Sequence, residues 1–236
     1  MTLRLSTKLR QQLMGVPVTI TGTDILVPAG AASYESTVVN FLTNGFRPGM
    51  TVKADGFVSD ENDVYSLVTK VDADGLQLTV TVSDADQLVQ VAASPSITIL
   101  AVPQSFKDIF TYGVLCIYTG SQPASADVAP TGTLLLVISI ASGDFVAGTL
   151  TNGLLWDAPV AGVLGKAAGV WSDAGLATGT AGWFRFYAND YDTGSNALCF
   201  DGAVGTSGAE LNLSSTAIVL AATTTIDEFE VTLPLA

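Results

Sequence analysis

From Val16 onward the chain alternates β-branched and polar residues, which is the two-residue period of strands lying between a core and solvent. Gly, Pro, Asn and Asp interrupt the alternation every few residues, so the predicted strands are short and joined by turns. In the first part of the chain we predict five strands, over 18–22, 51–55, 64–71, 76–82 and 96–100. The chain is therefore expected to be an all-β protein.

Two turns are predicted within this first part. The stretch Asp72-Ala-Asp-Gly75 is expected to form a tight hairpin, in which Gly75 can take a positive φ. A second turn is predicted over 44–49, and residues 34–42 before it fit either a helical turn or an edge strand. Residues 16–103 together are predicted to form a small β-barrel domain.

A second β-rich region follows Pro103. Ser105 has the side chain of a helix N-cap, and a short helix is predicted over 106–110, ending near Gly113. Six further strands are predicted between Gly-, Ala-, Ser- and Thr-rich turns, over 114–119, 133–141, 183–188, 197–204, 211–213 and 229–233. Short strands at this spacing favour an antiparallel β-sandwich, which we assign to residues 104–236.

The first 15 residues predict a short amphipathic helix, which Ser6 can cap and Gly15 can end. Its hydrophobic face is formed by Leu9, Leu13 and Met14. Because this segment is basic and the rest of the chain is acidic, we interpret residues 1–15 as a docking helix for an acidic neighbouring protein; a solvated helix face is the alternative. The residues expected to make the contact are Arg4, Leu5, Lys8, Leu9, Arg10 and Leu13.

Charge and hydropathy narrow the classes of partner. The net charge of −13 argues against nucleic acid, since phosphate contacts need Lys and Arg. No apolar run reaches the roughly 18 residues of a membrane-spanning helix, and charges near the N-terminus argue against a secretory signal, so we expect cytoplasmic synthesis and no membrane partner. The mean hydropathy of +0.46 is high for a lone soluble domain, which suggests that further copies of the chain cover part of its surface.

Histidine is absent, which excludes Ser-His-Asp and Cys-His activation of a nucleophile. Two acidic clusters contain the carboxylates that a glycosidase needs: Asp60, Glu61 and Asp63, and Asp190 and Asp192. Carboxylates spaced so closely beside Gly, Asn and Ser are far more often turn residues. We therefore predict no catalytic residues and no enzyme activity.

Metal and cofactor sites are not predicted either. The oxygen-rich stretches 72–75 and 189–192 lack the twelve-residue EF-hand pattern with its terminal Glu, so they allow adventitious calcium binding at most. The glycines between Gly153 and Gly169 lack the Gly-Lys-Ser/Thr ending of a phosphate-binding loop. No cofactor is expected.

Cysteine and tryptophan side chains are expected in the core. Cys116 and Cys199 each lie in an apolar strand, where a free buried thiol is the simpler interpretation and a disulfide between them is the alternative. The chain's tryptophans, Trp156, Trp171 and Trp183, have the chemistry of a carbohydrate-binding surface. Alternation in Trp-Phe-Arg-Phe-Tyr, however, puts aromatic residues on both faces of one strand, which favours core packing.

Several short blocks form an ordered set: Leu3–Thr7 with Leu9-Arg10, Phe106–Phe110, Tyr118–Asp127, Pro130–Leu134, Gly179–Arg185, Asp201-Gly202, Gly205–Gly208, Leu211–Ser214 and Thr225–Pro234. In this order they resemble a family of small proteins encoded in tailed-phage genomes and regarded as virion-structural. The match covers residues 1–15 and about 104–236. In the family members the N-terminal helix runs almost directly into the Phe-Lys-Asp-Ile-Phe segment, whereas about 88 residues intervene here. Residues 16–103 therefore look like an inserted domain, and their Gly-Phe-Arg-Pro-Gly turn is similar to turns of phage tail and fibre domains.

The resemblance implies a peripheral structural subunit of the virion, on the capsid or at the neck, collar or tail, and it carries no catalytic residues. The partners would then be other virion proteins and further copies of the chain, with the inserted barrel projecting outward. A host adhesin that binds a cell-surface glycan is the alternative, and an aromatic groove on the outer face would distinguish it. A carboxylate-pair hydrolase is the third hypothesis, and it predicts loss of turnover on Asp→Asn substitution in an exposed cleft.

Overall fold

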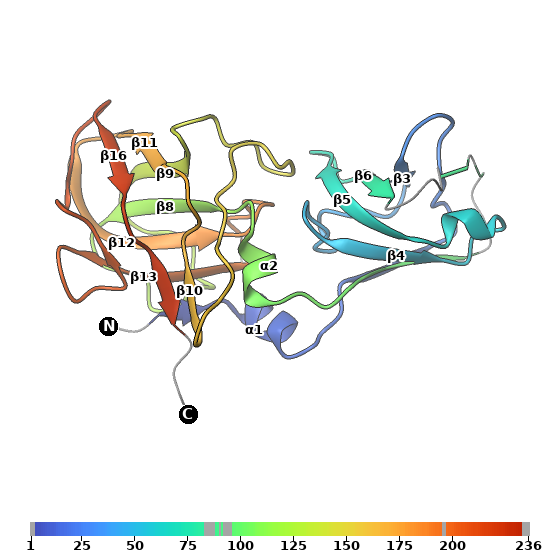
Figure 1. Ribbon diagram of the computed structural model, residues 1–236, viewed down its shortest axis with the longest axis horizontal. Helices are drawn as coiled ribbons and strands as arrows, with labels where there is room; N and C mark the ends of the chain where they lie inside the picture. The colour runs from blue at the N-terminus through green and yellow to red at the C-terminus, as the bar shows by residue number, and fades with distance from the viewer. Residues whose placement is uncertain (1–2, 83–87, 90, 92–95, 195–196, 233–236) are drawn as a thin grey trace. The chain divides into compact units, whose positions relative to one another are not determined.

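The computed structural model describes residues 3–82, 88–89, 91, 96–194 and 197–232, and the chain forms two compact units (Figure 1). Unit 1 comprises residues 1–13, 109–147 and 151–236, and unit 2 comprises 14–108 and 148–150. Sheets that are almost entirely antiparallel dominate both units, so the predicted all-β class is confirmed. The helices of the described residues are short: α1 (Thr7–Leu13), the 3₁₀ helix η1 (Asp60–Asn62) and α2 (Phe106–Phe110).

Unit 2 is built on one six-stranded sheet, in the order β2-β7-β4-β5-β6-β3. Its strands are β2 (Thr19–Gly22), β3 (Ser33–Glu35), β4 (Thr51–Asp55), β5 (Tyr65–Val71), β6 (Gln77–Val82) and β7 (Ile97–Ala101). All five predicted strands are present, and β3 shows that an edge strand begins the 34–42 stretch. Among the described residues β2 and β3 do not pair with each other, so the sheet is an open half-barrel rather than the closed barrel that we predicted.

The curled sheet of unit 2 buries one face of its strands. In β5, Ser66, Val68 and Val71 are buried, while the intervening Tyr65 and Leu67 are exposed. The inward residues surround a core that also contains Tyr34, Phe41, Phe46, Val52 and Ile99. The predicted hairpin between β5 and β6 is confirmed: Gly75 has φ 74°, and its N–H donates to Asp72 O at 2.8 Å.

Unit 1 is built on a nine-stranded sheet whose main path runs β1-β13-β12-β8-β9-β11-β16, with β14 beside β13 and β15 beside β12. Its strands are β1 (Arg4–Leu5), β8 (Val114–Thr119), β9 (Leu134–Ile140), β11 (Trp171–Ala174), β12 (Gly179–Tyr187), β13 (Cys199–Gly205), β14 (Leu211–Asn212), β15 (Ala217–Ile218) and β16 (Thr223–Ile226). A second small sheet pairs β10 (Val163–Gly165) with β17 (Glu230–Thr232). Residue 233, predicted to end the last strand, lies outside the described residues.

The large sheet of unit 1 is covered on both faces, as alternation in β12 predicts. On one face Trp183 stacks on Tyr118, with ring centroids 4.5 Å apart. On the other face Phe184 and Phe186 join a cluster of aromatic rings that includes Phe110, Trp156, Trp171, Phe200 and Phe229. The sheet is therefore the centre of unit 1 and not its surface.

The predicted cap of α2 is also confirmed. Ser105 Oγ accepts the N–H of Asp108 at 3.2 Å, and Asp108 Oδ2 accepts the N–H of Ser105 at 3.0 Å. Ser105 and Asp108 thus satisfy each other's backbone donors, as in a capping box. The helix buries Ile109 and Phe110, which fixes the chain where it enters unit 1.

Candidate functional site

The predicted docking residues lie in two consecutive elements rather than in one helix. Arg4 and Leu5 form β1, which pairs antiparallel with Asp201 and Phe200 of β13. Our assignment of these two residues to the helix was wrong, because the edge of β13 offers backbone partners that a helix would leave unpaired. The helix itself begins at Thr7, after Ser6, whose Oγ accepts the N–H of Leu9 at 3.3 Å.

Loop 121–128 holds the start of α1 in place. Asp127 accepts two hydrogen bonds from Thr7, from the N–H at 2.6 Å and from Oγ1 at 2.8 Å, and Arg4 Nη1 donates to Pro123 O. Burial would raise the pKa of the Asp127 carboxyl, but the hydrogen bonds from Thr7 and Ser125 outweigh it and hold that pKa below its usual value. The first turn of the helix is therefore tied to a loop about 120 residues away in sequence.

A buried ion pair lies beneath this loop. Arg185 Nη2 and Asp201 Oδ2 are 2.8 Å apart, and the two side chains are 1% and 0% exposed. Gln122 Nε2 donates to Asp201 Oδ1 at 2.7 Å, and Arg185 Nη1 donates to Val128 O at 2.8 Å, so both ends of loop 121–128 are bonded to the pair. We call residues 3–10, loop 121–128 and the Arg185–Asp201 pair the N-terminal clasp.

We did not predict this ion pair from the sequence, although the sequence contains an indication of it. Arg185 and Asp201 each stand among aromatic and aliphatic residues in a predicted strand. A single charge in an apolar strand needs a partner when the strand is buried, because an unpaired buried charge is costly. Opposite charges on two such strands therefore predict that the strands are neighbours, as β12 and β13 are.

The structure separates the six predicted docking residues into two groups. Arg4, Leu5 and Leu9 are used inside unit 1, Leu9 being completely buried. The others face outward to different degrees: Lys8 is half-buried, Arg10 is exposed and donates to Thr7 Oγ1 at 2.8 Å, and Leu13 is 39% exposed. Only the second group can meet a partner, and docking at these residues stays a prediction.

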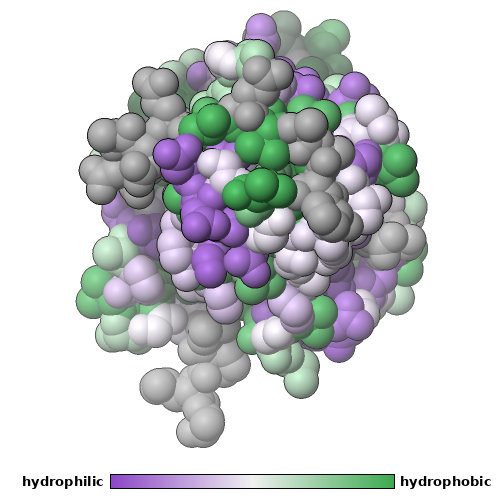
Figure 2. Space-filling model, turned by 90° about the vertical axis from the view of Figure 1, so that its right-hand side faces the viewer, coloured by the Kyte–Doolittle hydropathy of each residue, from purple (hydrophilic) through white to green (hydrophobic). Residues whose placement is uncertain are grey.

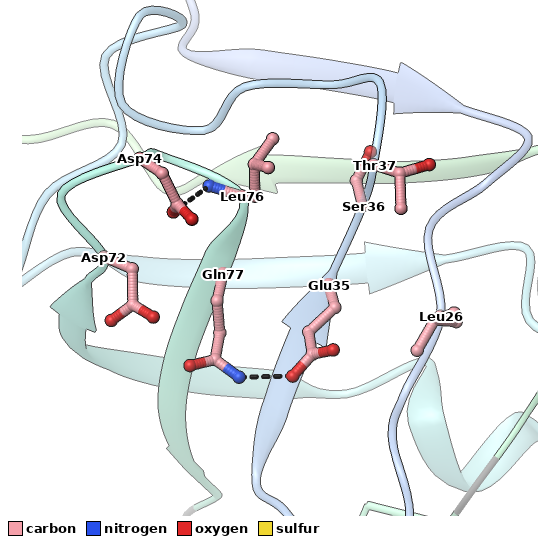
Figure 3. A pocket seen from close by; sticks show the side chains of 8 residues that line it. All are labelled: Leu26, Glu35, Ser36, Thr37, Asp72, Asp74, Leu76 and Gln77. Atoms are coloured by element: carbon pink, nitrogen blue, oxygen red, sulfur yellow. Dashed lines mark hydrogen bonds between the residues drawn. The ribbon is translucent and has the colours of Figure 1, made fainter.

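Unit 2 has a hollow of about 340 Å³ beside the β5–β6 hairpin (Figure 3). It is lined by Leu26, Glu35, Ser36, Thr37, Asp72, Asp74, Leu76 and Gln77. Each of its carboxylates already has an intramolecular partner. Gln77 donates to Glu35 and Leu76 N–H donates to Asp74 (Figure 3), and Lys70 pairs with Asp72. The carboxylates thus stabilise the turn and the neighbouring strands.

The acidic clusters considered for catalysis or calcium have comparable roles in turns. Asp63 Oδ1 accepts the N–H of Phe57 at 3.0 Å, and Asp192 Oδ1 accepts the N–H of Gly194 at 2.7 Å. Asp60 and Glu61 lie exposed in η1. Within the described ranges, no group of three or more His, Cys, Asp and Glu side chains is arranged to hold a metal ion.

The cysteines and tryptophans lie in the core, as predicted. Cys116 and Cys199 are both buried and both free thiols, so the disulfide alternative is wrong for this structure. Burial raises the pKa of the Cys116 thiol to about 11 and that of the Cys199 thiol to about 12. All three tryptophans are at most 4% exposed and form no outer groove.

Comparison of the chain with protein-family models, with curated proteins and with solved structures found no match. The family is therefore not established. None of the helices in the described part of the chain is long and apolar enough to cross a membrane.

Several of the ordered sequence blocks meet in one part of unit 1. Four of them supply the N-terminal clasp: Leu3–Thr7, Tyr118–Asp127, Gly179–Arg185 and Asp201-Gly202. A fifth, Phe106–Phe110, is the helix α2. The residues of these blocks form backbone pairings and buried side-chain contacts. None of them lines the acidic hollow of unit 2.

Proposed function

We propose that the chain is a structural subunit of a tailed-phage virion, at the periphery of the capsid or at the neck, collar or tail, and that it acts by assembling with other virion proteins. The observation that carries the proposal is the N-terminal clasp, in which four of the resembling blocks meet. A subunit of a particle must present its surfaces in a fixed geometry, and a buried ion pair that also bonds both ends of loop 121–128 contributes to that rigidity.

The division into units supports the same proposal. Unit 1 comprises nearly the residues that the resemblance covers, and unit 2 comprises nearly the 88 residues that interrupt it. A compact unit with its own core can be inserted into a host domain when the host keeps its contacts. Here the host unit retains the clasp on one side of the insertion and, on the other, the buried residues Ile109 and Phe110 at the end of α2.

Helix α1 supplies the surface for which we expect a partner within the particle. Lys8, Arg10 and Leu13 lie on the outside of a helix that is held to unit 1 by Thr7 and by the buried Leu9. An acidic neighbour would pair with the two cations, and the clasp holds them in place, which reduces the entropy lost on binding. The chain itself has 22 acidic residues, so its own copies are among the neighbours with suitable charge.

The proposal is tested on particles of the phage whose genome encodes the chain. Particles purified on a density gradient are expected to contain the chain by mass spectrometry, and immunogold electron microscopy then gives its location. Absence of the chain from the particles, together with abundance in the soluble lysate, would contradict the proposal.

The docking surface is tested with charge-reversed variants supplied to an infection that lacks the wild-type chain. Lys8→Glu with Arg10→Glu is expected to reduce incorporation into particles at least tenfold. Lys53→Glu with Lys70→Glu changes the net charge equally in unit 2 and is the matched control. Equal incorporation of both variants would show that α1 is not the attachment surface.

The adhesin alternative would be favoured by an aromatic groove on the outer face, and the described residues form none. All three tryptophans are in the core, and among the described residues Tyr65, at 56%, is the one largely exposed aromatic side chain. In the view of Figure 2, small groups of hydrophobic residues alternate with hydrophilic ones. Binding of the purified chain to a glycan array, with no incorporation into particles, would favour the adhesin instead.

A further inference from the structure

Strand β16 ends the nine-stranded sheet of unit 1 (Figure 1). It pairs with β11 on one side, from Trp171 opposite Ile226 to Ala174 opposite Thr223. On its other side no strand of the described residues pairs with it. The outer edge of β16 therefore presents backbone donors and acceptors that the described chain does not use.

The backbone groups at this edge can be assigned. Gly175 N–H donates to Ala222 O on the β11 side, at 2.9 Å. Since residues of an antiparallel ladder face the partner alternately, Thr224 and Ile226 also direct their N–H and C=O groups toward β11. Thr223 and Thr225 direct theirs outward, and both residues are exposed.

The sequence of this edge does not protect it against pairing. Its sequence is Thr-Thr-Thr-Ile, without Lys, Pro or a bulge, which are the features that usually keep edges apart. By comparison, β1 has only two residues before α1, and β3 is flanked by Leu26, which bridges to Glu35. An uncharged run of β-branched residues is a good template for another strand.

Exposed apolar side chains lie beside the start of β16. Leu176, Val219 and Leu220 are 55%, 53% and 59% exposed. Their backbone is ordered, because Ala221 N–H donates to Gly175 O at 2.7 Å and Leu220 N–H donates to Thr178 Oγ1 at 3.1 Å. The chain beside the open edge therefore has a defined conformation.

We propose that β16 pairs with β16 of a second copy of the chain, antiparallel and about a two-fold axis at Thr224. An antiparallel strand pair is self-complementary, as a two-fold interface requires. In this register Thr223 of each copy forms a hydrogen-bonded pair with Thr225 of the other, and the two Thr224 residues face each other.

The charges next to β16 select this arrangement. Asp227 and Glu228 follow the strand directly. The antiparallel register places Asp227 opposite Ala221 and Glu228 opposite Leu220, so no carboxylate faces another. A parallel pairing in register would place Asp227 beside Asp227 and Glu228 beside Glu228, which is unfavourable. The pairing is a property of the chain itself and does not require that the chain belong to a virion.

The test is the solution mass of the full chain by light scattering and analytical ultracentrifugation over a range of concentrations. A dimer of twice the 24.3 kDa chain is expected. Thr225→Pro removes an outward N–H without removing a bond to β11, and we expect it to raise the dimer dissociation constant at least tenfold. Thr225→Val keeps the N–H and is expected to remain dimeric.

Disulfide trapping tests the register and does not depend on whether the proline variant folds. Thr224→Cys is expected to cross-link two copies under mild oxidation, because facing residues of a non-hydrogen-bonded pair have Cα atoms about 4.5 Å apart. Thr223→Cys, one residue away, is the control and is expected to cross-link poorly. A monomer at all concentrations, or a dimer that neither Thr225→Pro weakens nor Thr224→Cys traps, would overturn this proposal and leave the virion proposal unaffected.

Discussion

At the residue scale, the Arg185–Asp201 pair shows what a buried charge requires of its surroundings. The pair lies at the centre of unit 1, with Gln122 and the backbone of Val128 as further partners. The alternation of β12 correctly places Arg185 on the same face as Trp183. Its partner was not predictable in that way, because Asp201 reaches it only through the pairing of β12 with β13.

Asp201→Asn is expected to destabilise unit 1 by about 3–5 kcal/mol, since it leaves the Arg185 charge buried without its counter-ion. Chemical denaturation followed by circular dichroism measures this loss. Lys70→Ala, which removes one partner of the exposed Lys70–Asp72 pair, is the control and should cost under about 1 kcal/mol. Equal losses in the two variants would contradict the role of the buried pair.

The two thiols should react only when the chain unfolds. Burial raises the pKa of Cys116 to about 11 and that of Cys199 to about 12, so both thiols stay protonated at pH 8. A thiol reagent at pH 8 is expected to label neither residue within minutes in the native chain and both in denaturant. Rapid native labelling of either residue would place it outside the core.

The clasp should weaken in acid. Because the pKa of Asp127 is lowered by its hydrogen bonds in the folded chain, its contribution is complete above the ordinary pKa of about 4 and is lost as the pH falls through the lower folded value. Hydrogen exchange at the Thr7 amide is expected to lose protection over that range. Asp127→Asn should make the protection independent of pH there.

At the element scale, alternation predicts the strands that are long and β-branched. Strands β4 and β8, of five and six residues, have the bounds that we predicted. Strands β10, β11, β15 and β16 were missed because they have two to four residues within Gly-, Ala- and Thr-rich sequence. Such strands form only because a neighbouring strand supplies hydrogen-bond partners, which one sequence does not reveal.

The β5–β6 hairpin depends on the absence of a side chain at Gly75. A Cβ at this position would lie 2.2 Å from Asn40 Oδ1, and φ is positive. Gly75→Ala is therefore expected to destabilise unit 2 by more than the roughly 1 kcal/mol of backbone strain. Gly30 also has a positive φ, but a Cβ there would meet no atom within 4 Å. Gly30→Ala therefore measures the backbone strain alone, and the larger loss of thermal stability expected for Gly75→Ala measures the added clash with Asn40.

At the scale of the whole molecule, the two units have separate cores. The sequence predicted this division through the resemblance and through the change of pattern at Pro103. The structure assigns residues 1–13 to unit 1, although the sequence suggested a separate docking segment, because β1 completes the sheet edge at β13. It also assigns residues 148–150 to unit 2, which no local pattern indicates.

Calorimetry is expected to resolve two unfolding transitions. Asp201→Asn should lower the midpoint of one and Gly75→Ala that of the other, because each substitution affects a different core. A single transition shifted equally by both variants would mean that the units unfold together.

The pairing of Arg4 with Asp201 has a consequence for synthesis on the ribosome. Strand β1 leaves the exit tunnel before its partner β13, which is made about 200 residues later, and this takes about 10–40 s at ordinary elongation rates. Residues 14–108 of unit 2 are complete well before that. Unit 2 can therefore fold while β1 is still unpaired, and the clasp closes only after the residues of unit 2 have been made.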